Sequence, residues 1–123
     1  MNVKEWILNA PGDVFLDKTE LDNNVKDDFV RVETQFSAIS IGTEVAAYKG
    51  ISPLRPVINP YPRKVGYCNV GRVKEVGSNV SGLTSGDLIY SHASHCSAYD
   101  ISNDQVLAVI PETVFAPHAA LCY

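Results

Sequence analysis

The stretch from residue 65 to residue 95, VGYCNVGRVKEVGSNVSGLTSGDLIYSHASH, most constrains how this chain can fold. Five glycines interrupt it, and the runs between them are short and rich in β-branched residues. Glycine adopts turn conformations that other residues avoid, and β-branched runs between turns are typical of strands. The stretch therefore predicts several short strands joined by tight turns.

Similar runs occur along the rest of the chain, with the spacing of an all-β barrel or sandwich. In residues 29–40 apolar side chains alternate with polar or charged ones, which predicts a strand with one solvent-exposed face. The predicted strands are residues 3–8, 14–21, 29–40, 69–76, 87–92, 97–101 and 106–110.

Three segments depart from this strand pattern. Residues 41–50 have a helical pattern, with Thr43 as a possible cap and Gly50 as the stop. Four prolines in residues 51–64 predict an irregular loop, because proline disfavours both helices and central strands. After Pro111 a short helix is expected, interrupted at Pro117.

The charge balance and the hydropathy pattern exclude several classes of partner. The formal net charge is −4 and the pI is about 5.2, which argues against a nucleic-acid or anionic-membrane surface. No apolar run reaches the roughly 18 residues that a membrane span needs. The N-terminus lacks the pattern of a signal peptide, and the three cysteines form no disulfide framework, so we expect a cytoplasmic protein.

Two histidines and a cysteine in the sequence HASHC raise the question of a metal site. His92, His95 and Cys96 have side chains that suit zinc, and Cys68 could approach them. Their spacing matches no closed structural zinc site, and on a strand the two histidines would point to opposite faces. We favour the interpretation that both are partly exposed loop histidines beside a cleft, and we expect no metal.

Four segments in the right order resemble the medium-chain dehydrogenase/reductase superfamily, which includes the zinc-type alcohol dehydrogenases. EVGSNVSGLTSGDLIY is similar to the family's strand–turn–strand, and GYCNVGRV is similar to its GHExxGxV motif. SAISIGTEVAAYKG resembles the family's CGICGSD segment, and LAVIPETVFAPHAAL resembles its IPxxxxxxxAA segment. The resemblance covers roughly residues 30–121 and implies a mainly β, partly open GroES-like barrel with short helical turns, spanning residues 1–123 as one domain.

The departures from the family's motifs concern its catalytic zinc, which needs three protein ligands and an open position. The family's cysteine ligand falls here at Ser40 or Ile41, its histidine ligand at Tyr67, and the neighbouring glutamate at Cys68. Serine and tyrosine are poor zinc ligands. The resemblance therefore implies a zinc-independent relative, with no metal at the family's site.

The same comparison of motifs suggests which residues form the site. Thr43 falls where the family has a hydroxyl that relays protons, and Tyr67 could project its phenol into the same cleft, so we expect both to be catalytic. Ser40 and His92 are expected to bind substrate. Thr43 could equally serve as a helix N-cap, and Tyr67 as a half-buried aromatic of the barrel. Glu44 is expected to orient a neighbouring basic group.

The nucleotide-binding motif of the family is missing from this sequence. No G-x-G-x-x-G turn occurs, and GSNVSG lies between two predicted strands instead of between a strand and a helix. We expect NAD or NADP to bind the full-length enzyme, with no tight binding by this chain alone. A Rossmann domain or partner subunit would then have to supply the nucleotide site, and an uncovered apolar face could lead to homo-oligomers.

Two hypotheses about function follow. The chain is either the substrate-binding catalytic domain of a zinc-independent NAD(P)-dependent oxidoreductase, inactive alone, or a stand-alone GroES-like binding or assembly module without catalysis. The substrate in the first hypothesis is a small alcohol or carbonyl compound, and the chain is then a fragment of a longer enzyme.

Overall fold

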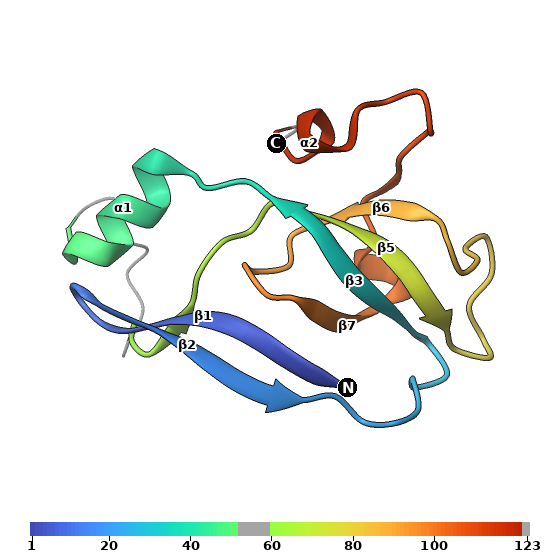
Figure 1. The fold of residues 1–123 in the computed structure, drawn as a ribbon, viewed down its shortest axis with the longest axis horizontal. Coiled ribbons are helices and arrows are strands. Elements are labelled where there is room, and N and C mark those ends of the chain that lie inside the picture. Colours follow the sequence, from blue (N-terminus) through green and yellow to red (C-terminus); the bar gives the residue numbers. More distant parts are fainter. Residues whose placement is uncertain (52–59, 122–123) are drawn as a thin grey trace.

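The chain folds into two antiparallel β-sheets with short helices at their ends (Figure 1). The computed structural model describes residues 1–51 and 60–121. The smaller sheet has the order β2-β1-β4, with β1 Asn2–Ala10, β2 Asp13–Glu20 and β4 Arg63–Lys64. The larger sheet has the order β7-β3-β5-β6-β8, with β3 Phe29–Ser37, β5 Asn69–Val76, β6 Leu88–Ser91, β7 Ala98–Ser102 and β8 Ala108–Val109. The helices are α1 Ile41–Lys49, the 3-10 helix η1 Asn103–Gln105, and α2 Ala116–Ala119.

This architecture confirms the predicted fold class. The described residues are mainly strand, and neither sheet closes on itself, as expected for a partial GroES-like β fold. One apolar cluster lies within the larger sheet and includes Val30, Val73 and Ile89. A second cluster includes Val70 and Tyr90 and is completed by α2.

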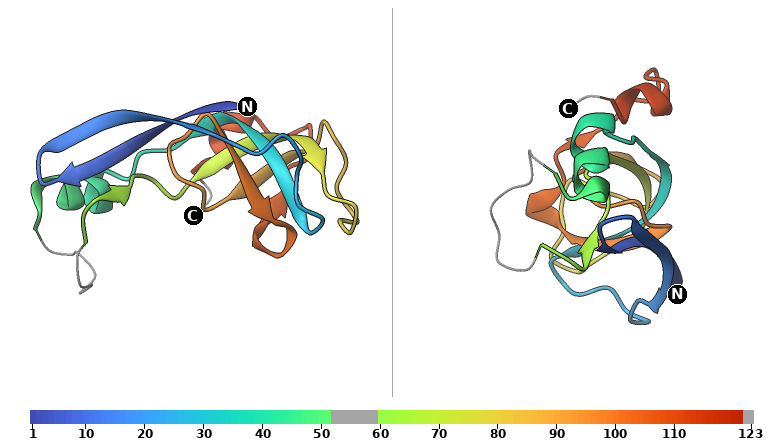
Figure 2. Two further views of the ribbon diagram at one scale, coloured as in Figure 1. Left: turned by 90° about the horizontal axis from the view of Figure 1, so that it is seen from below. Right: turned by 90° about the vertical axis from the view of Figure 1, so that its left-hand side faces the viewer.

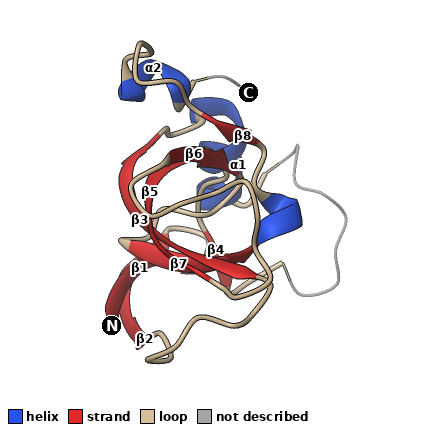
Figure 3. Cartoon of the chain, turned by 90° about the vertical axis from the view of Figure 1, so that its right-hand side faces the viewer, coloured by secondary structure: helices blue, strands red, loops and turns tan. Residues whose placement is uncertain are grey.

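The β1–β2 hairpin extends along the larger sheet, and its turn lies beside α1 (Figures 1 and 2). Figure 3 shows β1 next to β7 of the larger sheet. The turn is attached there because the Gly12 N–H donates to the Tyr48 carbonyl at 2.7 Å. The two sheets meet at the segment Ser94–Ser97, which forms an isolated bridge from Cys96 to Glu5. The Trp6 N–H donates to the His95 carbonyl at 3.1 Å, and the Ser97 N–H donates to the Lys4 carbonyl at 2.8 Å.

The strand β3 differs from the predicted strand with one solvent-exposed face. Val30 and Val32 are buried as predicted, but Arg31 between them is buried as well. Its guanidinium makes a bidentate contact with Asp100 on the neighbouring β7, at 2.8 and 2.9 Å, which supplies the partner that a buried charge needs. The hydrogen bond that Arg31 donates to Asp100 raises the pKa of Arg31, so the guanidinium stays charged.

Several predicted element boundaries are wrong, for local reasons. The helix α1 begins at Ile41 with Ser40 as its N-cap, so Thr43 lies inside the first turn and is not the cap. Residues 63–64 lie in the predicted loop but form β4, because β1 offers them an unpaired edge. Residues 52–59 of that loop lie outside the described residues.

The C-terminal part also differs from the prediction. The strand expected over residues 106–110 is reduced to β8, because η1 precedes it. Pro117 does not interrupt a helix: it lies in the first turn of α2, where its missing N–H costs no hydrogen bond.

Two glycines illustrate different backbone requirements. Gly82 adopts a φ of 80°, as a turn glycine with positive φ should. Gly77 lies next to a turn as well, yet its φ is not positive. A Cβ at Gly77 would instead collide with the carbonyl groups of Lys26 and Asp27, so close packing of two backbones requires this glycine.

Candidate functional site

The first turn of α1 is organised by Glu44. One carboxylate oxygen of Glu44 accepts the Ser40 N–H at 2.5 Å, while the Glu44 N–H donates to the Ser40 carbonyl at 2.9 Å. Ser40 makes no hydrogen bond to the helix with its own side chain. An acidic side chain at this position also interacts favourably with the helix dipole. The carboxylate thus takes the place of a side-chain cap.

His95 lies against this carboxylate in the interior of the molecule. Its Nε2 is 2.5 Å from the other oxygen of Glu44, and its Nδ1 is 2.8 Å from the hydroxyl of Ser37. The side chains of His95 and Glu44 are only 10% and 9% exposed. A carboxylate accepts hydrogen bonds, so Nε2 carries a proton and donates to Glu44, while Nδ1 lies within hydrogen-bond distance of the Ser37 hydroxyl. His95 is thus only slightly exposed, and its ring is held by contacts within the chain.

Residues 92–95 hold the segment that carries Tyr67 at two points. The Nδ1 of His92 lies 2.9 Å from the Tyr67 carbonyl, and because a carbonyl only accepts, Nδ1 is the protonated nitrogen. The His95 N–H donates to the Val65 carbonyl at 2.7 Å. Gly66 lies between them with a φ of 95°, and a Cβ there would be 2.6 Å from the His95 Nε2.

Tyr67 and Cys68 occupy the positions where the resembling family has its histidine and glutamate. Tyr67 is partly buried and packs against the apolar cluster that includes Cys68, Tyr90 and Ala119 of α2. Cys68 is 5% exposed, and its sulfur accepts a hydrogen bond from the Tyr90 hydroxyl. Tyr67 is thus a half-buried barrel aromatic, which leaves its catalytic role a prediction.

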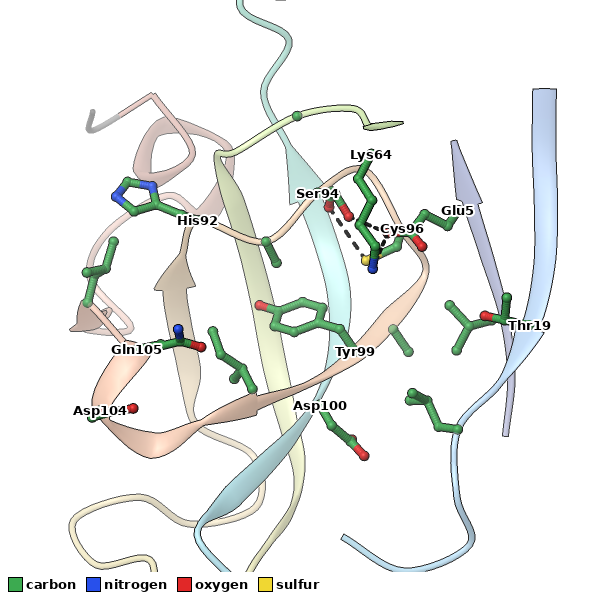
Figure 4. Close-up of a pocket in the computed structure, with 17 residues that line it drawn as sticks. Glu5, Thr19, Lys64, His92, Ser94, Cys96, Tyr99, Asp100, Asp104 and Gln105 are labelled. Atoms are coloured by element: carbon green, nitrogen blue, oxygen red, sulfur yellow. Dashed lines mark hydrogen bonds and ion pairs between the residues drawn. The ribbon is translucent and has the colours of Figure 1, made fainter. Parts of the chain in front are cut away.

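A cavity of about 680 Å³ opens between the two sheets (Figure 4). One side holds Glu5, whose carboxylate accepts from the Ser94 hydroxyl at 2.6 Å and lies 3.2 Å from the Lys64 ammonium. Tyr99 lies at the centre of the view and His92 on the opposite side. His92 also lines a second, more apolar cavity of about 500 Å³ beside β8.

The structure brings some of the predicted site residues together and leaves others apart. His92 contacts the backbone of Tyr67, and Ser40 and Thr43 share the first turn of α1. His92 lines both cavities, whereas Ser40, Thr43 and Tyr67 line neither of them. The catalytic and substrate-binding roles of these four residues therefore stay predictions.

The sequence alone did not predict the contact between His95 and Glu44, although it predicted a role for Glu44. Glu44 was expected to orient a basic group, and that group is His95. The two residues are 51 positions apart, and the pattern of a single sequence does not reveal such a pairing.

The three residues considered for a metal site have separate partners. His92 contacts Tyr67, His95 contacts Glu44 and Ser37, and the Cys96 thiol contacts the Ser94 carbonyl. Among the described residues, no group of three or more His, Cys, Asp or Glu side chains is placed to share a metal ion. Burial raises the pKa of the Cys96 thiol, which favours its uncharged form.

A buried polar group supports the loop that carries these histidines. The side-chain amide of Asn69 is fully buried and donates to the Ser94 carbonyl and the Thr34 hydroxyl, both at 3.0 Å. The Tyr99 hydroxyl donates to Asn69 at 3.3 Å and pairs with the Ser91 hydroxyl at 2.8 Å. Burial raises the pKa of Tyr99 to about 12, so its hydroxyl keeps its proton at neutral pH.

Comparison with known proteins identifies the fold. No family model and no curated protein matches the sequence. The solved structures that share this fold include enoyl thioester reductases, a quinone oxidoreductase and a butanediol dehydrogenase. At the identities observed, 16–24% among the eight structures compared, the likeness establishes the fold. The resemblance noted in the sequence is therefore confirmed at the level of the fold.

Three of these structures illustrate the likeness. A putative NADPH:quinone reductase from Bacillus thuringiensis superposes with a TM-score of 0.79 and 22% identity, over 100% of this chain and 38% of its own. The CurF ER cyclopropanase of the curacin A biosynthetic pathway gives 0.80 and 19%, over 98% and 39%. The Escherichia coli quinone oxidoreductase complexed with NADPH gives 0.68 and 21%, over 100% and 37%. This chain thus spans well under half the length of each.

Within the described residues, no helix is long and apolar enough to cross a membrane.

Proposed function

We propose that residues 1–123 form the GroES-like, substrate-binding catalytic domain of a zinc-independent NAD(P)-dependent oxidoreductase that acts on a small alcohol or carbonyl compound. The observation that carries the proposal is the superposition of 90–100% of this chain on 34–43% of oxidoreductase chains. On this basis the rest of the enzyme, in the same polypeptide or in a partner subunit, binds the dinucleotide. The free thiols of Cys68 and Cys96 are consistent with a reducing, cytoplasmic location.

The absence of a dinucleotide site from this chain is part of the proposal. In the described residues, α1 follows β3 through residues 38–40 and has one glycine in its first turn, not a glycine-rich loop. The residues present therefore do not fit NAD(P) by themselves. When bound to the complete enzyme, the cofactor supplies a hydride, and this chain supplies the group that exchanges a proton with the substrate oxygen.

The proposed proton donors are the hydroxyls of Tyr67 and Thr43. Thr43 lies exposed in the first turn of α1, and Tyr67 lies in the segment that His92 and His95 hold. Ser40 and His92 would bind the substrate beside them. His92 is exposed and borders both cavities, which gives it access to a ligand in either.

Zinc independence rests on the chemistry of the residues at the family's ligand positions. A tyrosine phenol and a serine hydroxyl replace the histidine and cysteine, and both are weak ligands for zinc. The neighbouring glutamate of the family is replaced by Cys68, whose thiol is buried in an apolar cluster and accepts a hydrogen bond from Tyr90.

This chain has an exposed apolar surface that the remainder of the enzyme would cover. Ile39, Ile41, Phe115 and Leu121, which we call the apolar face, are between 64% and 79% exposed. Ala38, next to Ile39, packs on the cluster that contains α2, which places this face around the start of α1 and α2. Such a surface is typical of an interface. It equally suits the alternative hypothesis, a stand-alone module that docks on another protein without catalysis.

Steady-state assays of the complete protein test the proposal. We expect oxidation of NADPH or NADH with at least one member of a panel of aldehydes, ketones, quinones and enoyl thioesters, unchanged by prior dialysis against EDTA. Tyr67→Phe should lower kcat by about a hundredfold or more, because it removes a proton donor. Tyr48→Phe, at an exposed tyrosine of α1, is the matched control and should leave kcat unchanged.

Three results would contradict the proposal. Loss of activity on dialysis, with recovery on adding zinc, would overturn zinc independence. Full activity of Tyr67→Phe would remove Tyr67 from the mechanism. A gene that ends after Tyr123, with no subunit that binds NAD(P), would favour the stand-alone module.

A further inference from the structure

His95 is the residue at which three separate parts of the molecule meet. Its backbone carbonyl accepts the Trp6 N–H of β1, and its backbone N–H donates to the Val65 carbonyl. Its ring joins Glu44 of α1 to Ser37 at the end of β3. A single residue therefore links β3, α1 and the segment before Tyr67.

The ring does not itself reach either cavity. The order Ser37, His95, Glu44 is that of a proton relay in hydrolases, but neither Ser37 nor His95 lines the 680 Å³ or the 500 Å³ cavity. Both ring nitrogens are also engaged by side chains of the chain itself. The side-chain contacts of His95 lead to the residues of the proposed site.

We propose that His95 is a positioning residue, which orients the first turn of α1 and the Gly66–Tyr67 backbone for the reaction. The inference rests on the proposed function, because the residues that it positions are Thr43, Ser40 and Tyr67. His95 was given no role in the reaction by the comparison with the family's zinc-ligand motifs.

The path from the ring to α1 runs through the Glu44 carboxylate. The Nε2–H of His95 donates to one carboxylate oxygen, and the other oxygen accepts the Ser40 N–H. Loss of the first contact frees the carboxylate to rotate, and the N-terminal turn then loses its substitute cap. Thr43 lies in that turn, three residues beyond Ser40.

The path from the ring to Tyr67 is a packing contact. The space that a Cβ of Gly66 would occupy is filled by the three ring atoms Nε2, Cδ2 and Cε1 of His95. The ring therefore holds the backbone immediately before Tyr67, while His92 holds the Tyr67 carbonyl. A site residue needs such support from its neighbours to be placed accurately.

Two amide variants separate the two ring contacts. In His95→Gln the amide N–H2 can replace Nε2 and keep the bond to Glu44. In His95→Asn the shorter side chain extends only as far as Nδ1 does, so its amide can contact Ser37 but does not reach Glu44. We expect kcat of His95→Asn to be lower than that of His95→Gln by about tenfold, because a misplaced catalytic group costs rate without costing much binding. KM for NADPH should stay within about twofold in both, because this chain does not bind the dinucleotide.

Assays of the complete enzyme, with thermal unfolding of each variant, test the inference. Glu44→Gln changes the other partner of the hydrogen bond between His95 and Glu44, and it replaces His95→Asn in the test if that variant does not fold. His118→Gln, at an exposed histidine of α2, is the matched control and should leave kcat unchanged. The inference is supported if kcat is lower in His95→Asn and Glu44→Gln than in His95→Gln while the melting temperatures of the three variants are equal.

The contrary results are distinct from those for the proposed function. An active wild type whose His95→Asn and Glu44→Gln variants keep full kcat would overturn only the positioning role. So would a kcat loss that is equal in His95→Asn and His95→Gln. A wild type with no NAD(P)H turnover on any substrate would overturn the proposed function and this inference with it.

Discussion

Tyr99 shows how a single buried hydroxyl supports the loop that carries the histidines. Its hydroxyl donates to Asn69, and Asn69 in turn donates to the carbonyl of Ser94. Because Tyr99 is largely buried, its ionised form is disfavoured in the folded protein. The stability of the fold therefore depends on pH in a range where tyrosine ionises.

We predict that the free energy of unfolding falls between pH 10 and pH 12. An unfolded tyrosine ionises near 10.0, whereas burial raises the pKa of Tyr99 to about 12 in the fold. The stabilisation is complete below pH 10 and is lost as the pH rises through 12, about 2–3 kcal/mol in all. Urea unfolding at pH 9 and pH 12 should show this extra loss in the wild type relative to Tyr99→Phe. An equal loss in both would contradict the prediction.

The residues also show what a single sequence can reveal. Val30, Val32 and Val73 were predictable core residues, because their alternation along strands needs no knowledge of partners. Arg31 and His95 were not, because each is buried by virtue of one distant partner, Asp100 and Glu44. The fold thus followed from local patterns, whereas the interior polar contacts of the candidate site did not.

At the scale of elements, the turn after β5 is fastened to the loop before β3. The Gly77 N–H donates to the Phe29 carbonyl, and the Asn79 N–H donates to the Asp27 carbonyl. The Ser78 hydroxyl adds a bond to the Asp27 carboxylate at 2.9 Å. This contact fixes one end of the β3–β5 pair and explains why the backbones approach so closely at Gly77.

We predict that Gly77→Ala destabilises the protein by about 3 kcal/mol, because its Cβ would force two carbonyl groups apart. Gly82→Ala should cost only about 1 kcal/mol, because its Cβ meets open space and only its positive φ is unfavourable. Urea unfolding of both variants measures the two costs. Equal costs would show that the close approach at Gly77 relaxes without penalty.

Helix and strand ends were the least predictable elements. Thr43 is a good capping residue, but Glu44 satisfies the Ser40 N–H and the helix begins two residues before Thr43. Residues 63–64 read as a loop because their strand character comes from the free edge of β1. A local contact between Glu44 and Ser40 thus decides where the helix begins, whereas a tertiary contact overrides the local preference at residues 63–64.

At the scale of the whole molecule, polar and apolar surfaces are unevenly distributed. The apolar face lies around the start of α1 and α2. In an oxidoreductase of more than twice this length, the additional polypeptide is the proposed cover for this face. If that polypeptide is missing, we expect the apolar face to be buried against another molecule.

We predict that the 123-residue chain alone self-associates through the apolar face. Replacing Ile39, Ile41 and Phe115 together with serine should shift light-scattering masses toward the 13.4 kDa monomer, because the exposed apolar area falls. Phe15→Ser on β2, 43% exposed and outside the apolar face, is the control and should change little. A wild-type chain that stays monomeric at millimolar concentration would contradict the prediction.

The bridge between Glu5 and Cys96 sets an order of events during synthesis. The first strand emerges from the ribosome about 90 residues before the segment to which the bridge attaches it. Until then β1 has β2 as a nearby partner, and an isolated hairpin is only marginally stable in water. The exposed Trp6, Phe15 and Leu16 of that hairpin are then open to the solvent and to chaperones. The two sheets are therefore joined only when residues 94–97 have been synthesised.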